Sequence, residues 1–140
     1  MSNQPSTQSN NPSRAVKYTF LGLRLVAAAA FLAAGGAKLA GVPMMVEVFE
    51  HIGLGQWFRT VTGLVEVTGA IALLIPVTAG LAGLLLAVTM CFATFTHLFV
   101  IGGSPVPAIV LMLITASIAW LHRARIWNLI RSTQARLSGS

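Results

Sequence analysis

Long apolar stretches broken by short turns make up most of this chain. No Asp, Glu, Lys or Arg occurs between Glu66 and Arg123. A membrane-spanning helix takes about 20 mostly apolar residues, so this stretch alone has room for about two and a half spans. With Pro76 and the glycine–proline turn around Gly103 as breaks, the pattern predicts an all-α integral membrane protein, a four-helix bundle with short turns. The expected spans are residues 19–39, 58–75, 78–100 and 106–121.

Polar segments frame this apolar body at both ends. Residues 1–17 consist mostly of polar residues and proline, and we expect a disordered tail there. Residues 18–122 form the predicted membrane domain, and residues 123–140 form a basic tail. In the first loop, residues 44–49 favour a short amphipathic turn on the membrane surface. The apolar core of a signal peptide has about 7–15 residues. The first apolar run is longer than that and contains Arg24, so we interpret it as a retained span.

The charge balance points to a membrane protein rather than a soluble one. Only 9% of the residues are charged, against roughly 25% in an ordinary soluble domain. The net charge of +6 would suggest nucleic acid in a soluble protein, but the cations lie mostly in the tails, where they set membrane topology. We therefore expect no nucleic-acid partner, and both termini on the cytoplasmic side of the membrane. The single cysteine, Cys91, excludes an intramolecular disulfide, a CxxC pair and a thiolate metal site.

Two ionisable residues lie well inside the expected spans, Arg24 in the first and Glu66 in the second. Placing a charged side chain inside the bilayer costs free energy, so such residues are candidates for a functional role. The faces beside them carry Ala27, Ala28, Phe31, Gly35 and Lys38 on the first span and Thr62, Gly63, Gly69 and Ala70 on the second. Small residues let neighbouring helices approach closely, so we expect these faces to pack together, with Arg24 and Glu66 as an intramembrane ion pair. The pair is either structural or a functional group for proton relay or headgroup binding.

Two motifs give a resemblance to a known family. The first span carries Leu23-Arg24-Leu25, Phe31, Gly35 and Lys38-Leu39, and the second carries Gly63-Leu64-Val65-Glu66-Val67-Thr68-Gly69-Ala70 and Leu73-Leu74. Both motifs resemble those of the DoxX-like membrane proteins, and the resemblance covers residues 19–122. It implies a four-helix inner-membrane protein with no catalytic centre established for the family as a whole. Some members are similar to the small subunit of a thiosulfate:quinone oxidoreductase, and others are membrane partners of soluble enzymes in redox-stress complexes.

The resemblance favours a non-catalytic membrane subunit or scaffold of such a redox complex. We identify no catalytic residue and no metal site in the sequence. The expected partners are the lipid bilayer and either soluble redox enzymes or further copies of this chain. The alternative is a small proton-coupled transporter that uses Glu66 in the membrane. A cation such as Arg24 beside Glu66 argues against it, because that cation would hold the carboxylate ionised.

If the chain has a redox role, the expected cofactor is a quinone. It would bind between the first three spans, toward the outer leaflet of the membrane. Lys38, Thr94 and His97 would offer hydrogen bonds to its carbonyl oxygens. The apolar walls of the site would be Phe31, Met90 and Phe95. An apolar slot with a few polar groups is typical of ligand pockets. The other interpretation is a tightly packed bundle without a cavity, in which Lys38 snorkels to the interface and His97 binds a backbone carbonyl.

Overall fold

Helices follow one another through the whole of the described chain. The computed structural model describes residues 14–138. Its elements are α1 (Arg14–Leu39), α2 (Pro43–Ile52), α3 (Gln56–Leu74), α4 (Ala79–Thr96), the π-helical segment η1 (His97–Ile101), α5 (Val106–Leu121) and α6 (Arg123–Ser138). No strand occurs within these residues, and the all-α prediction is confirmed for them.

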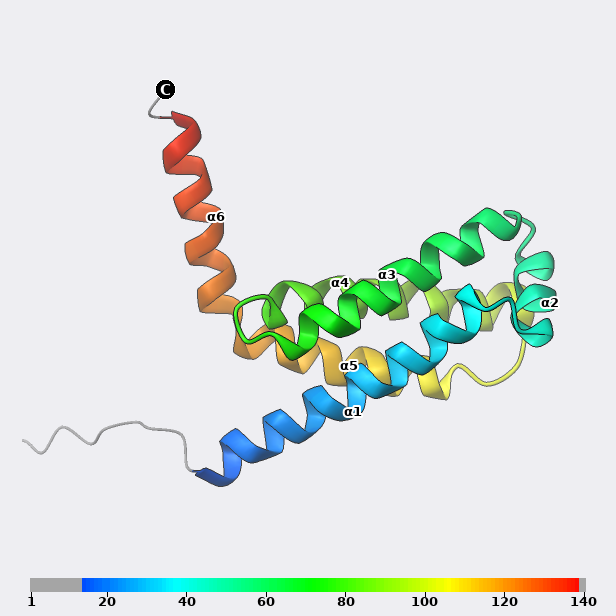
Figure 1. Cartoon of the computed structure of the whole chain (residues 1–140), viewed down its shortest axis with the longest axis horizontal. Helices are drawn as coiled ribbons and strands as arrows, with labels where there is room; N and C mark the ends of the chain where they lie inside the picture. Colours follow the sequence, from blue (N-terminus) through cyan, green and yellow to red (C-terminus); the bar gives the residue numbers. More distant parts are fainter. Residues whose placement is uncertain (1–13, 139–140) are drawn as a thin grey trace, which may run out of the picture.

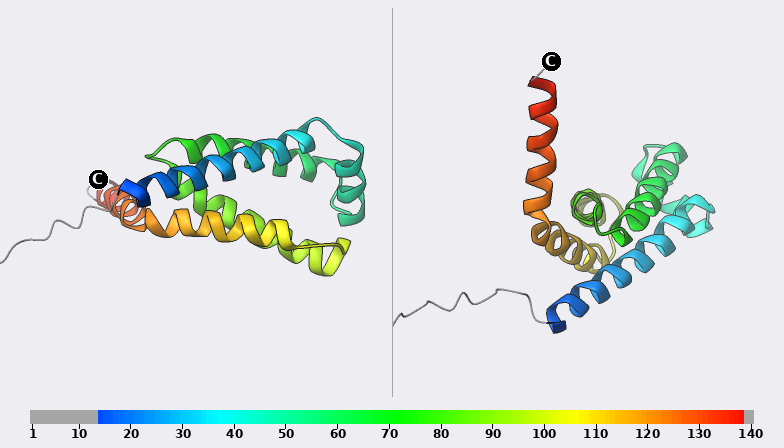
Figure 2. Two further views of the ribbon diagram at one scale, coloured as in Figure 1. Left: turned by 90° about the horizontal axis from the view of Figure 1, so that it is seen from below. Right: turned by 60° about the vertical axis from the view of Figure 1, so that its left-hand side comes forward.

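Four long helices, α1, α3, α4 and α5, run roughly antiparallel to their chain neighbours along the molecule (Figure 1). Helix α1 packs along α3 and α4 along α5, while α3 also contacts α4 and α1 contacts α5. Figure 2 shows the two pairs as layers that meet where α1 begins and α5 ends, and that diverge toward the opposite end. We call the first of these the terminal end and the other the loop end. Helix α2 lies at the loop end, in contact with α1, α3 and η1.

Within residues 14–138, three helices are long and apolar enough to cross a membrane: α1, α3, and α4 continued through η1. Helix α5 is apolar but has 16 residues. That length is about 24 Å of helix, short of the roughly 30 Å of a hydrocarbon core. Large apolar side chains point outward from these helices, and Leu25, Phe92 and Leu113 are each more than half exposed. Such an outer surface suits lipid rather than water.

Both predicted tails contain helix where the structure describes them. Residues 14–17 form the first turn of α1, so the predicted disorder is wrong for them, and residues 1–13 lie outside the described residues. The basic tail is helical through α6, which leaves the bundle steeply at the terminal end (Figure 1). No Gly or Pro lies between Pro107 and Gly139, so no strong helix breaker interrupts α5 and α6.

The first loop is more ordered than the short turn expected at residues 44–49. Helix α2 begins at Pro43, a position where the missing N–H of proline has no helical partner to lose. It ends at Gly53, whose φ of +77° suits glycine best. Gln56 Nε2 donates a 3.1 Å hydrogen bond to the Val46 carbonyl oxygen, which ties α2 to the start of α3.

Candidate functional site

A close backbone contact joins α1 and α3. A Cβ added to Gly35 would lie 2.9 Å from the Gly63 carbonyl oxygen, and one added to Gly63 would lie 3.1 Å from the Gly35 carbonyl oxygen. Neither position has room for a side chain, so glycine at both sets the helix spacing. Phe31 of α1 and Ala70 of α3 are fully buried in the core nearby. The predicted packing of these two faces is confirmed.

An ion pair lies beside this glycine contact. Lys38 Nζ donates to Glu66 Oε2 at 2.7 Å, and the Lys38 and Glu66 side chains are 14% and 3% exposed. Each residue follows a contact glycine by three positions, which places it on the same face of its helix. The register set by Gly35 and Gly63 therefore brings the two charges together. Both partners are largely removed from solvent, so removing either one leaves an uncompensated charge.

The predicted Arg24–Glu66 pair is wrong, and the register of the two helices explains why. Arg24 lies level with the last residues of α3 and bonds to the carbonyl oxygens of Leu73 and Leu74. Leu73 follows Glu66 by seven residues, or about 10 Å of helix. The prediction counted depth from the expected ends of each span and so placed Arg24 too near Glu66. Glu66 takes Lys38 as its partner instead, where we expected Lys38 near the interface.

Arg24 instead caps the carboxyl end of α3. Its Nε donates to the Leu73 carbonyl oxygen at 2.9 Å, and its Nη2 donates to the Leu74 carbonyl oxygen at 2.8 Å. The last carbonyls of a helix lack intrahelical partners and carry the negative end of the helix dipole. A cation at this point satisfies two acceptors that lipid cannot satisfy. The role of Arg24 is thus to close a helix end.

Arg59 has the corresponding role at the loop end. Its Nη1 donates to the carbonyl oxygen of Lys38, near the end of α1, and its Nε donates to Gln56 Oε1 at 2.7 Å. Each helix of the pair therefore supplies an arginine that caps the other. No role is predicted for Arg59 from the sequence patterns described above. The signal in the sequence was one arginine in the first half of each of two consecutive, antiparallel spans.

The structure places the apolar residues predicted for a quinone site in two different environments. Phe31 and Met90 are buried in the core of the bundle. Phe95 is 58% exposed and its ring centroid lies 4.6 Å from that of Phe99 on the outer face. Two hollows on the described part of the chain are lined by other residues. The quinone site stays a prediction.

The polar residues predicted for that site have separate environments. Lys38 is bound to Glu66, and Thr94 Oγ1 donates to the Met90 carbonyl oxygen of its own helix at 2.8 Å. His97 begins η1, and its Nδ1 is buried without a hydrogen-bond partner. π-Helical turns often occur at functional sites, so His97 is still a candidate functional residue.

The comparisons with known proteins agree with the two motifs. Residues 22–121 match the model of the DoxX-like family, a range that contains Arg24, Lys38 and Glu66. The chain belongs to the DoxX-like family. This DoxX-like protein is also 38% identical, over 97 residues, to a Bacillus subtilis (strain 168) protein described as uncharacterized protein YdgD, and the match covers 63% of this chain and 82% of that protein. No solved structure matches the chain.

Proposed function

We propose that this DoxX-like protein is a non-catalytic membrane subunit that spans the bilayer four times and seats a soluble redox enzyme at the membrane. The enclosed Lys38–Glu66 pair carries the proposal. Glu66 is 2% exposed, is bound to Lys38, and lies one turn from the Gly63 backbone that touches α1. A charge held in this way fixes how two helices pack. Helices held in one arrangement by such a pair present a constant surface to which another protein can bind.

The alternative function, a proton-coupled transporter, would use Glu66 as the group that gains and loses a proton. Each protonation of Glu66 would leave the Lys38 ammonium without its counter-charge. Breaking a buried pair costs about 3–5 kcal/mol in soluble proteins. The pair therefore favours the fixed subunit over the transporter.

Helix α6 is the element we propose for docking the partner. It leaves the bundle at the terminal end (Figure 1) and has four arginines and no acidic residue among its 16 residues. Trp127 is 60% exposed, and Arg131 is exposed as well. A cationic helix with exposed apolar side chains suits the membrane–water interface, and its arginines suit an acidic protein surface. The redox character of the partner rests on the family resemblance.

Membrane placement is tested by reporter fusions. Four spans place both termini on one side, and the arginines of the terminal segments make that side the cytoplasm. A reporter fused after Ser140 is expected to be cytoplasmic, and one inserted near Gly53 is expected on the opposite side. Finding both reporters on one side would contradict the four-span placement.

The docking role is tested by crosslinking the tagged full-length chain in its native membrane and identifying what copurifies by mass spectrometry. We expect a soluble redox enzyme, recovered in lower yield with Arg131→Gln because that change removes an exposed cation from α6. The matched control is Lys17→Gln, which removes an exposed cation at the same end of the bundle but from α1. It should leave the recovery unchanged.

Two results would contradict the proposed function. One is the absence of any redox enzyme among the crosslinked proteins. The other is proton movement into vesicles that contain only the purified chain, if Glu66→Gln abolishes it while the variant stays folded. That second result would favour the transporter.

A further inference from the structure

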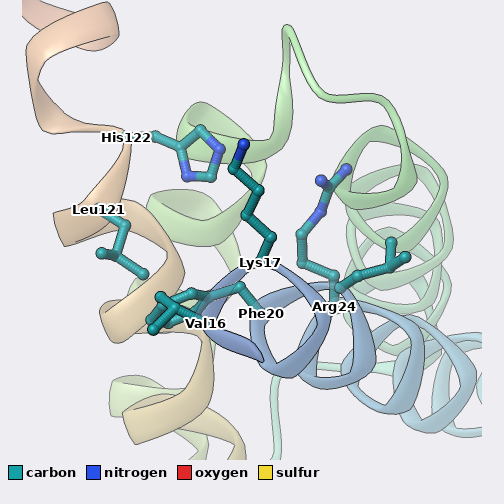
Figure 3. A pocket seen from close by; sticks show the side chains of 7 residues that line it. Val16, Lys17, Phe20, Arg24, Leu121 and His122 are labelled. Atoms are coloured by element: carbon teal, nitrogen blue, oxygen red, sulfur yellow. The ribbon is translucent and has the colours of Figure 1, made fainter. Parts of the chain in front are cut away.

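A hollow of about 290 Å³ opens on the surface at the terminal end, between α1 and the end of α5. Its polar lining is Lys17, Arg24 and His122, and its apolar lining includes Phe20 and Leu121. Figure 3 shows the Lys17 ammonium, the His122 ring and the Arg24 guanidinium around one space, with Phe20 and Leu121 at its side. Lys17 and Arg24 come from α1, and His122 directly follows α5. The hollow therefore forms only when these distant segments pack together.

The polar groups differ in how firmly they are held. Arg24 is fixed by its two hydrogen bonds to the end of α3, and it keeps its positive charge there. His122 Nδ1 donates to the Ile118 carbonyl oxygen at 2.9 Å, which orients the ring. Lys17 is exposed and its long side chain can reach across the opening. A fixed cation and an adjustable one thus face the same space.

No acidic side chain balances these cations at the terminal end. The three acidic residues of the whole chain are Glu47, Glu50 and Glu66. The first two lie on α2 at the loop end, and Glu66 is bound to Lys38. A hollow lined by cations, with all side-chain carboxylates elsewhere, suits an anionic ligand.

The position of the hollow indicates where that anion comes from. Trp120 is 68% exposed, and the Arg123 guanidinium lies 4.6 Å from its ring centroid. An exposed tryptophan beside a cation is typical of the headgroup layer of a membrane. Leu121 and His122, which line the hollow, follow Trp120 directly in the chain. The hollow therefore lies at headgroup depth, with Phe20 and Leu21 of α1 available to acyl chains.

We propose that this hollow binds the phosphate of an anionic phospholipid from the leaflet on the terminal side. Lys17 and Arg24 attract the phosphate, and the apolar lining holds the upper part of an acyl chain. Basic pockets between membrane helices bind anionic headgroups in this way. The inference rests on the membrane placement proposed above, but not on the docking of a redox partner.

The test is native mass spectrometry of the purified full-length protein, titrated with phosphatidylglycerol and, separately, with phosphatidylcholine. We expect tighter binding of phosphatidylglycerol, and an about fivefold weaker affinity for it in Lys17→Gln, as expected for one lost cation near an anionic headgroup. Lys17→Arg should retain the affinity. Arg131→Gln is the matched control, because Arg131 does not line the hollow, and it should bind as the unaltered protein does. Lys17 is exposed, so melting temperatures should agree among the variants.

Four results would overturn the site. Equal affinity for the two lipids would show that the hollow does not recognise an anionic headgroup. Equal weakening by Lys17→Gln and Arg131→Gln would show only general charge attraction, and unchanged binding in Lys17→Gln would exclude the hollow. Displacement of phosphatidylglycerol by an equal concentration of inorganic phosphate would assign the hollow to a soluble anion. None of these results depends on the crosslinking experiment, in which Lys17→Gln and Arg131→Gln have the opposite expected effects.

Discussion

Glu66→Gln will lower the free energy of unfolding of the bundle by about 3 kcal/mol, the lower end of the range for breaking a buried pair. The change removes the counter-charge of Lys38 and leaves its ammonium among apolar groups. The lower end of that range applies because the Lys38 side chain is 14% exposed and its ammonium can shift toward the membrane–water interface. Reversible unfolding of the purified protein in detergent micelles measures the loss.

A double-mutant cycle identifies the partner of Glu66. Lys38→Gln combined with Glu66→Gln should cost less than the sum of the single changes, with a coupling of roughly 1–3 kcal/mol. Arg24→Gln combined with Glu66→Gln should be additive within about 0.5 kcal/mol, because the Arg24 guanidinium bonds to carbonyls at the end of α3. Coupling of Glu66 to Arg24 but not to Lys38 would reverse this assignment.

The sequence was sufficient to predict which faces of the first two spans meet. Small residues at helical spacing beside each buried charge indicated close packing, and Gly35 and Gly63 do approach at backbone distance. The absence of charge between Glu66 and Arg123 likewise located the apolar helices to within a few residues at most ends. Both patterns are local properties of a helix, and local patterns survive folding with little change.

The partner of each charge could not be predicted from the same patterns. Pairing depends on how far one helix slides along the other, and helical periodicity carries no information on that displacement. The tight fit of two glycines sets it, and it places Lys38 rather than Arg24 beside Glu66. Arg24 then meets the unsatisfied carbonyls of α3, a type of partner that no side-chain pattern displays. One arginine in the first half of each span was a signal, but it could not be assigned to a helix cap until the register was known.

The helix after residue 122 illustrates a different limit. Its arginines were interpreted as topology signals, which said nothing of its conformation. Four arginines among 16 residues do not oppose a helix, since Arg has a high helix propensity. The arginines predict only a membrane topology, whereas the lack of Gly and Pro was the better guide to the helical structure.

Gly35→Ala will separate α1 from α3 and destabilise the bundle by about 2 kcal/mol, within the usual range for overpacking. The added methyl group would lie 2.9 Å from both the Gly63 carbonyl oxygen and Val67 Cγ2. A backbone carbonyl inside a helix cannot turn away, so the whole helix must move. The matched control is Gly36→Ala, one position along α1, where nothing lies within 4 Å of the added methyl group. It should be neutral or stabilising by up to about 1 kcal/mol, the usual helix advantage of Ala over Gly.

The same displacement connects the glycine contact to the ion pair. Moving α1 outward lengthens the 2.7 Å Lys38–Glu66 contact, so Gly35→Ala already weakens what Glu66→Gln removes. The two changes together should therefore cost less than the sum of their separate effects, as expected for residues that share a backbone shift. Gly36→Ala combined with Glu66→Gln should be additive, because Gly36 faces open space. Additivity for Gly35 as well would mean that the ion pair forms independently of the helix spacing, and that the glycines do not set the register on which the site depends.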